Sequence, residues 1–139
     1  MVKVYICSPL RGDYYSNQRK AEKYCRAAVM LGFFPVAPHI YLTRFMDDDN
    51  LKERKQALEI GLSLIEECEA MWVFIPDGET PSEGMQREID RAKQRGMFIA
   101  YFSVETALDL IAQERFADIS RIIEKQAAYR EEEKQNEQN

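Results

Sequence analysis

The sequence has few of the side chains that usually bind metals or form disulfides. His39 is its only histidine, and the cysteines Cys7, Cys25 and Cys68 are an odd number at wide spacings with no CxxC pair. These features argue against a metal centre and against a disulfide framework. We therefore expect no metal, no other cofactor and reduced thiols, as in a cytoplasmic protein.

Long apolar runs and an excess of positive charge are also missing. No apolar run approaches the roughly 20 residues that cross a bilayer, and the start of the chain lacks the charged and apolar regions of a secretory signal. The formal net charge is −5, and the sequence shows no basic groove. We expect no membrane partner and no nucleic-acid partner, whereas a local site for a small phosphate ligand is compatible with this charge.

What the chain does contain is the composition of a soluble globular domain. Its 139 residues are 45% hydrophobic and 31% charged, and this length suits one domain with its own core. Apolar segments at 2–7, 33–37, 71–75 and 97–102 alternate with segments of helical periodicity. This alternation predicts an α/β fold with three layers, in which a flavodoxin-like or Rossmann-like parallel sheet of four to five strands is covered by helices.

The predicted domain spans residues 1–112, and a C-terminal helical extension with a polar, frayed end spans residues 113–139. Ser16 or Asn17 is expected to cap the first helix, and His39 to begin a loop. In the extension, an apolar stripe is formed by Phe116, Ile119, Ile122 and Ile123. The stripe predicts a homo-oligomer, unless the helix folds back on its own domain.

The segment 71–96 is the crossover around which the rest is organised. An apolar strand is followed by a turn containing Asp77, after which Ser82 is expected to cap a helix and Gly96 to end it. Such a helix start offers free N–H groups to an anion, and phosphate is the expected guest. Glu88 lies one turn after Gly84, so its side chain leans toward this end over an open patch. The ordinary explanation of the same spacing is a cap, a packing glycine and a solvated glutamate.

Polar residues also follow the other strands. Loops that begin at Ser8, His39 and Pro76 meet at the carboxyl edge of the predicted sheet, where parallel α/β proteins bind ligands. The acidic run 47–49 lacks the spacing of a calcium loop. We interpret it as a solvated loop, followed by a capping box of Asn50 and Glu53.

Three motifs, VYICSPLRGD, APHIY and SEGMQREI, make the sequence similar to the nucleoside 2-deoxyribosyltransferase superfamily. The resemblance is greatest to its deoxynucleoside 5′-monophosphate N-glycosidases and to related small bacterial and phage proteins, and it covers roughly residues 2–102. It implies a small-molecule nucleotide as partner and cleavage or transfer of its N-glycosidic bond. It also implies a homo-oligomer, because this family commonly completes its sites from a neighbouring subunit.

The resemblance assigns a role to each matching residue. Glu88 matches the nucleophilic carboxylate and Tyr5 the tyrosine that orients it, so these two are the expected catalytic residues. Arg11 and Gly12 match a phosphate loop, Ser82 and Gly84 a monophosphate-binding turn, and His39 a residue of the base pocket. The full set of expected binding residues is Ser8, Arg11, Gly12, His39, Asp77, Ser82 and Gly84.

One position departs from the family pattern. The aspartate that helps to protonate the leaving base falls at Gly61, with Glu59 and Asp77 as the nearest replacements. Loss of a general acid costs a glycosidase roughly 10²–10⁴-fold in rate. Two hypotheses follow: an N-glycosidase that acts through Glu88, and a non-catalytic protein that captures a nucleotide-derived ligand in the same cleft.

Overall fold

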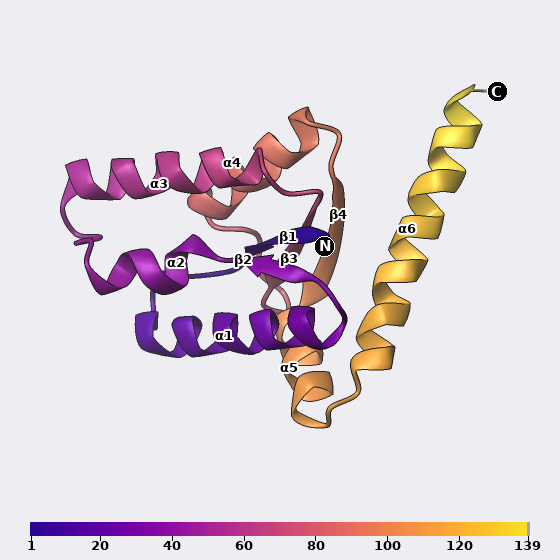
Figure 1. The fold of residues 1–139 in the computed structure, drawn as a ribbon, viewed down its shortest axis with the longest axis horizontal. Coiled ribbons are helices and arrows are strands. Elements are labelled where there is room, and N and C mark those ends of the chain that lie inside the picture. Colours follow the sequence, from indigo (N-terminus) through magenta and orange to yellow (C-terminus); the bar gives the residue numbers. More distant parts are fainter. Residues whose placement is uncertain (139) are drawn as a thin grey trace.

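The apolar segments of the chain form four parallel strands between two layers of helices (Figure 1). The computed structural model describes residues 1–138. The strands are β1 (Lys3–Cys7), β2 (Phe34–Val36), β3 (Ala70–Ile75) and β4 (Phe98–Ser103), in the order β2-β1-β3-β4. The predicted three-layer α/β fold is therefore confirmed.

The helices divide between the two faces of the sheet (Figure 1). One face is covered by α1 (Tyr14–Met30) and α5 (Val104–Ala112), and the other by α3 (Leu51–Ile65) and α4 (Glu83–Gln94). The short helix α2 (Pro38–Tyr41) and the 3-10 turn η1 (Leu42–Arg44) follow β2. The last helix is α6 (Phe116–Gln138). Among residues 1–138, no helix combines the length and hydrophobicity needed to cross a membrane.

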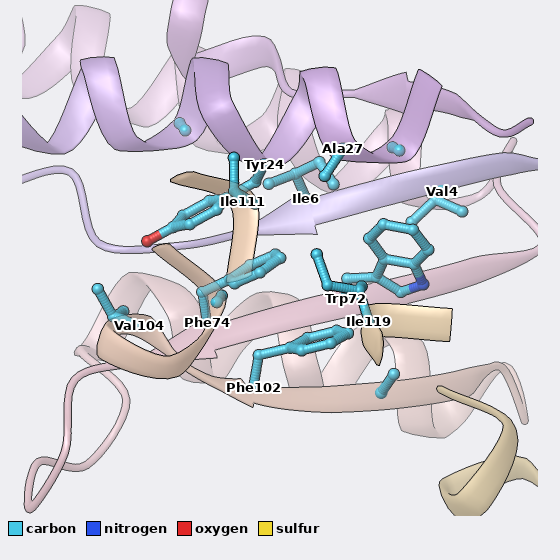
Figure 2. Close-up of a cluster of buried hydrophobic side chains, with 14 of the residues drawn as sticks. Val4, Ile6, Tyr24, Ala27, Trp72, Phe74, Phe102, Val104, Ile111 and Ile119 are labelled. Atoms are coloured by element: carbon cyan, nitrogen blue, oxygen red, sulfur yellow. The ribbon is translucent and has the colours of Figure 1, made fainter. Parts of the chain in front are cut away.

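Alternating side chains of β1 separate two apolar cores. Val4 and Ile6 belong to the larger core, under α1 and α5, whereas Tyr5 and Cys7 belong to the core under α3 and α4. The larger core contains stacked and edge-on aromatic rings, those of Tyr24, Phe74, Phe102 and Trp72 (Figure 2). The ring of Phe33 packs edge-on against Trp72. Tyr5 is consequently directed away from this aromatic cluster and toward α3 and α4, the second of which carries Glu88.

The order of the strands determines where a ligand can bind. From β1 the chain passes to β2 on one side and then crosses to β3 on the other side, so the winding direction reverses at β1. The loops after β1, β2 and β3 leave from this edge, at the switch point where α/β sheets bind their ligands.

Two local expectations are wrong. The cap of α1 is Asp13, whose Oδ1 accepts a hydrogen bond from the Ser16 N–H at 3.2 Å. Asn17 instead donates its side-chain amide to the carbonyls of Leu10 and Arg11. The expected loop at His39 is a short helix, because Pro38 occupies its first turn, where the fixed φ of proline favours a helix start.

The expected capping box is found only in part. The Asn50 side chain accepts from the N–H groups of Lys52 and Glu53, as a cap does. The Glu53 carboxylate does not return to Asn50 but accepts from the Asp47 N–H at 3.4 Å. Glu53 thereby helps to hold the acidic loop at the start of α3.

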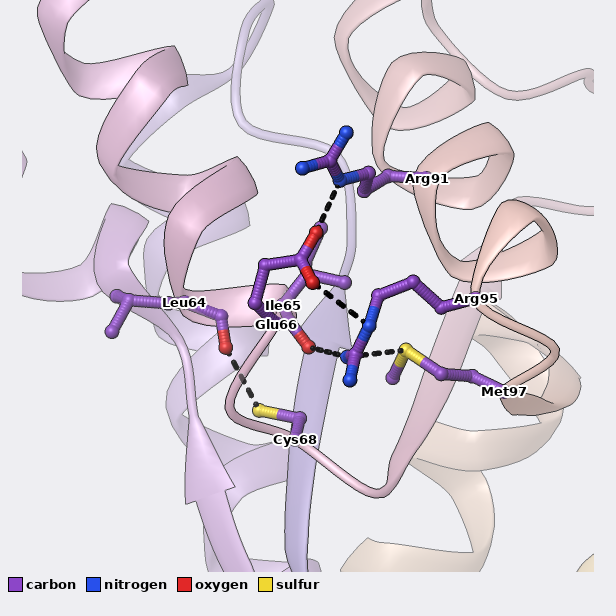
Figure 3. A network of polar contacts seen from close by, with 7 residues as sticks. All are labelled: Leu64, Ile65, Glu66, Cys68, Arg91, Arg95 and Met97. Carbon is purple, nitrogen blue, oxygen red and sulfur yellow. Dashed lines mark hydrogen bonds and ion pairs between the residues drawn. The ribbon is translucent and has the colours of Figure 1, made fainter.

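The ends of α3 and α4 are joined by an ionic cluster (Figure 3). Glu66 lies 2.5 Å from Arg91 Nε and 2.9 Å from Arg95 Nε, and Arg95 also donates to the Ile65 carbonyl at 2.7 Å. Partly exposed pairs of this kind add little stability each. The cluster nevertheless fixes the relative position of the two helices that carry Gly61 and Glu88.

The apolar stripe of α6 packs against its own domain. Ile119 is only 3% exposed, and the partly buried Phe116, Ile122 and Ile123 contact the larger core. The fold-back alternative is thus observed, and the stripe is not a free surface for a second subunit. The polar segment expected to fray remains helical to Gln138, and position 139 lies outside the described residues.

Both edge strands of the sheet, β4 and β2, have features that hinder pairing with a further strand. Beside β4, the Gln126 side-chain amide accepts from the Tyr101 N–H and donates to the Tyr101 carbonyl, each at 2.8 Å. Figure 1 shows α6 running along this strand. The opposite edge strand, β2, contains Pro35 at its centre, which has no N–H to offer.

Candidate active site

A cavity of about 340 Å³ opens at the switch point, between the end of β1, the short helix α2, and helices α3 and α4. Its apolar wall includes Leu10, Pro38, Leu42, Met46, Ala57 and Leu58. A mostly apolar cavity with a few convergent polar groups is typical of a small-molecule site.

Glu88 projects into this cavity from the second turn of α4. The buried Tyr5 hydroxyl donates a hydrogen bond to Glu88 Oε2, and the Cys7 thiol lies 3.6 Å from Oε1. The two residues with expected catalytic roles, Glu88 and Tyr5, are therefore in direct contact. The contact with Cys7 was not anticipated from the sequence.

The surroundings of Glu88 alter its charge. Burial raises the pKa of Glu88 to about 7, and the hydrogen bonds from Tyr5 and Cys7 act in the opposite direction. Burial, followed by the charge of Glu88, raises the pKa values of Tyr5 and Cys7 well above their usual ranges. Both neighbours stay protonated as donors, while Glu88 changes its charge near neutral pH.

Gly61 explains how the tyrosine and the glutamate can meet beneath α3. A Cβ atom at this position would lie 3.0 Å from the Tyr5 hydroxyl oxygen and 3.7 Å from Glu88 Oε2. The interior glycine of α3 therefore has a packing reason.

His39 and Ser8 form a second polar group in the cavity. Ser8 Oγ and His39 Nε2 lie within hydrogen-bond distance, at 3.2 Å. Burial lowers the pKa of His39 to about 4, so the imidazole is neutral near pH 7. A neutral imidazole offers one donor and one acceptor, which suits recognition of an uncharged heterocycle.

Arg11 reaches the cavity but is already paired. Its half-exposed guanidinium lies 3.3 Å from Asp48 and 3.8 Å from Asp49. An incoming phosphate has to compete with these two carboxylates for Arg11.

The start of α4 forms another part of the cavity wall. Ser82 caps the helix by accepting from the Met85 N–H at 3.3 Å, and Ser82, Glu83 and Gly84 all line the cavity. A Cβ atom at Gly84 would have open space around it. The start of α4, where the first N–H groups of a helix lack partners within the helix, thus lies beside unfilled volume.

Two expected binding residues are not brought to the cavity. Asp77 lies in an exposed turn and its N–H donates to Glu105 of α5 at 2.9 Å, so the turn leans toward the opposite layer. Gly12 has a φ of 98° and serves to turn the chain into α1.

Four carboxylates in the cavity lining are not among the expected site residues: Asp47, Asp48, Glu53 and Glu83. The signal for the first three is the acidic run 47–49 followed by the predicted cap, a pattern that is also typical of a solvated loop. The exposed Glu59, expected as a replacement acid, does not line the cavity.

Solved structures share this architecture. A 2-deoxyribosyltransferase from the psychrotolerant bacterium Bacillus psychrosaccharolyticus is 19% identical, with a TM-score of 0.58 over 73% of this chain and 72% of its own. A 2-deoxyribosyltransferase from Leishmania mexicana is 15% identical, with a TM-score of 0.55 over 74% of this chain and 65% of its own. The fold is therefore that of 2-deoxyribosyltransferases, and the similarity expected from the sequence is confirmed at this level.

A family model defines the chain more closely. The protein belongs to the family described as "Domain of unknown function (DUF7768)", whose model matches residues 2–102. The matched part contains the whole sheet apart from the last residue of β4, together with every residue of the candidate site. Among curated proteins there is no match.

Proposed function

We propose that this protein cleaves or transfers the N-glycosidic bond of a (deoxy)nucleoside 5′-monophosphate, with Glu88 as nucleophile. The observation that carries the proposal is the Glu88 carboxylate, held by the Tyr5 hydroxyl at the wall of a cavity on the switch point of the sheet. The 2-deoxyribosyltransferase fold supports the same class of reaction.

The proposed chemistry has two displacements. The ionised Glu88 attacks the anomeric carbon, a bond forms from its oxygen to that carbon, and the bond to the base nitrogen breaks with its electron pair remaining on the base. Water then attacks the same carbon and releases the carboxylate, or a second base does so in a transfer reaction. A covalent intermediate divides one difficult substitution into two easier steps.

The departing base requires a proton. With glycine at position 61, this proton comes from water or from the carboxylates that line the cavity. Of these, Asp48 and Glu83 are paired with Arg11 and Arg87, whereas within residues 1–138 Glu53 accepts a hydrogen bond only from the Asp47 N–H. Glu53 is therefore the side chain we assign first to this step.

The phosphate is assigned to the start of α4. Ser82 and Gly84, at the N-terminus of α4, lie on the cavity wall, and Arg11 lines the same cavity from the loop after β1. A helix N-terminus and a guanidinium favour a dianionic group, and phosphate replaces Asp48 and Asp49 as the partner of Arg11.

The alternative is capture of a nucleotide-derived ligand without cleavage. The observation that favours it is Gly61, because the Tyr5 hydroxyl would lie 3.0 Å from a Cβ atom there and leaves no room for an acid. In that case Glu88 accepts a hydrogen bond from a sugar hydroxyl.

The two functions are separated by incubating the protein with deoxynucleoside 5′-monophosphates and the matching nucleosides. We expect free base in the chromatogram, and a larger rise in melting temperature with the monophosphates. Glu88→Gln should abolish base release but retain nucleotide affinity, because the amide keeps the shape and is a far poorer nucleophile.

Equal stabilisation by nucleosides and monophosphates would reject the phosphate assignment. Base release by Glu88→Gln at the wild-type rate would reject Glu88 as nucleophile. Stabilisation without any base release in the wild type would establish the binding alternative.

A further inference from the structure

Cys7 has a contact that neither the resemblance nor the fold family assigns. It is the last residue of β1 and is 0% exposed, and its Sγ lies 3.6 Å from Glu88 Oε1 and 3.8 Å from the Met85 carbonyl oxygen. Because alternate residues of a strand point to the same face, Tyr5 and Cys7 approach Glu88 together.

We propose that Cys7 is a positioning residue that holds the second oxygen of the Glu88 carboxylate. The Tyr5 hydroxyl donates to Oε2 and the Cys7 thiol donates to Oε1, so β1 binds both oxygens from the core side. The role of this contact in cleavage rests on the proposed function, whereas the contact itself does not.

The thiol is suited to donate rather than to react. Burial, followed by the charge of Glu88, raises the pKa of Cys7 well above its usual range, and Cys7 does not line the cavity. Its one proton has two acceptors, and an ionised carboxylate is a stronger acceptor than a carbonyl. The proton therefore points to Glu88 when Glu88 is charged.

The mechanical consequence concerns rotation of the carboxylate. The terminal torsion of a glutamate is broad, so a single donor leaves the plane of the carboxylate free to turn. Donors on both oxygens fix that plane and present a defined oxygen edge to the cavity. Removal of the thiol would leave Oε1 without its partner among residues 1–138.

Other ionisable groups surround Glu88 at a greater distance. On the cavity side they are Arg11, His39, Asp47, Asp48, Glu53 and Arg54, with Glu83 at the start of α4. On the core side, Cys68 lies near Tyr5, and Tyr101 of β4 lies near Cys7. In the part of the chain that the structure describes, only Tyr5 and Cys7 hydrogen-bond to the Glu88 carboxylate.

The test measures the pKa of Glu88 directly, by carbon NMR of its side-chain carboxyl, with the signal assigned from its loss in Glu88→Gln. Cys7→Ala should raise this pKa by roughly half a unit to one unit, because it removes a hydrogen bond to the charged form. If base release is observed, the rise of kcat/KM with pH should move upward by the same amount.

Cys68→Ala is the matched control. Cys68 is also buried in the core under α3 and α4, but its thiol donates to the Leu64 carbonyl at 3.4 Å (Figure 3), and within residues 1–138 it makes no hydrogen bond to Glu88. This variant loses the same sulfur from the same core, and it should leave the pKa of Glu88 unchanged. A role of Cys7 in packing alone would predict the same behaviour for both alanine variants.

An unchanged pKa of Glu88 in a folded Cys7→Ala variant would overturn the proposal. If that variant does not fold, the proposal is tested in the wild type through the S–H stretching band of Cys7, which is assigned from its loss in Cys7→Ser. The band should move as Glu88 titrates, and a band that does not respond to pH would also overturn it. If Cys7→Ala raises the pKa of Glu88 but the wild type releases no base, the proposed enzyme activity is rejected and the role of Cys7 is retained. If the wild type releases base but the pKa of Glu88 is the same in Cys7→Ala, the role of Cys7 is rejected and the enzyme activity is retained.

Discussion

At the scale of single residues, the site joins a glutamate with a raised pKa to donors that favour its charged form. Burial dominates, because the pKa of Glu88 lies at about 7 despite hydrogen bonds from Tyr5 and Cys7. In the proposed reaction the ionised form of Glu88 is the nucleophile, so activity should rise as pH increases through about 7. The same ionisation opposes folding.

This opposition predicts a pH-dependent stability. A carboxyl whose pKa is raised in the folded state binds more protons there than in the unfolded chain, so its contribution to stability is complete below the unfolded value and is lost as pH rises through about 7. We expect Glu88→Gln to gain roughly 3 kcal/mol relative to wild type between pH 4 and pH 8. Denaturant unfolding at both pH values measures the difference.

Glu59→Gln provides the control for this measurement, since Glu59 is an exposed glutamate outside the cavity. Its stability relative to wild type should be nearly independent of pH. A Glu88→Gln variant that shows the same flat profile would contradict the raised pKa.

Residue-level contacts were predictable only in part. The pairing of Tyr5 with Glu88 follows from the family resemblance, and the alternation along β1 is consistent with it. The contact of Cys7 with Glu88 could not be read from the sequence, because it depends on how closely α4 approaches the end of β1. The lining role of Glu53 was hidden by its position in a capping pattern.

At the scale of elements, the approach of α3 to β1 depends on Gly61. Glycine to alanine in a helix interior normally stabilises by about 1 kcal/mol. Here the new Cβ would lie 3.0 Å from the hydroxyl of Tyr5, a residue that is only 1% exposed and has little room to move. We expect Gly61→Ala to destabilise by roughly 1–3 kcal/mol, measured as the free energy of unfolding without ligand.

Gly84→Ala is the matched comparison, because its Cβ would meet open space at the start of α4. It should be as stable as the wild type or slightly more so. Equal gains in stability for both alanine variants would show that Tyr5 yields easily and that Gly61 is not required for the contact.

Element types were more predictable than their ends. All four strands and the helix after Ser82 were expected, because apolar runs and caps are local signals. The cap at Asp13 and the helix at Pro38 were not, since each depends on which of several nearby polar or turn residues the backbone uses. The packing of α6 depends on long-range contacts, so the sequence alone left two alternatives open: an apolar stripe that joins subunits, and a helix folded back on its own domain.

At the scale of the whole molecule, the question is whether one chain completes the site. The surface first predicted to join subunits is covered, because Ile119 and its neighbours on α6 pack into the domain. The family resemblance still predicts a homo-oligomer through another surface. Light scattering at micromolar concentration should give at least twice the chain mass of 16.3 kDa, and a monomeric mass would reject the oligomer.

The pairing of Gln126 with the backbone of Tyr101 has a consequence for behaviour at high concentration. The exposed edge of a sheet is a template on which further strands can add, and this leads to aggregation. On β4 the Gln126 amide occupies the Tyr101 groups to which an incoming strand would bind, and on β2 Pro35 has no N–H with which to bind one. The last helix therefore acts as a barrier to fibrous growth, and Arg130 extends this protection past Gln126, because it donates to the Gly96 carbonyl and lies over the ring of Phe98 at the start of β4.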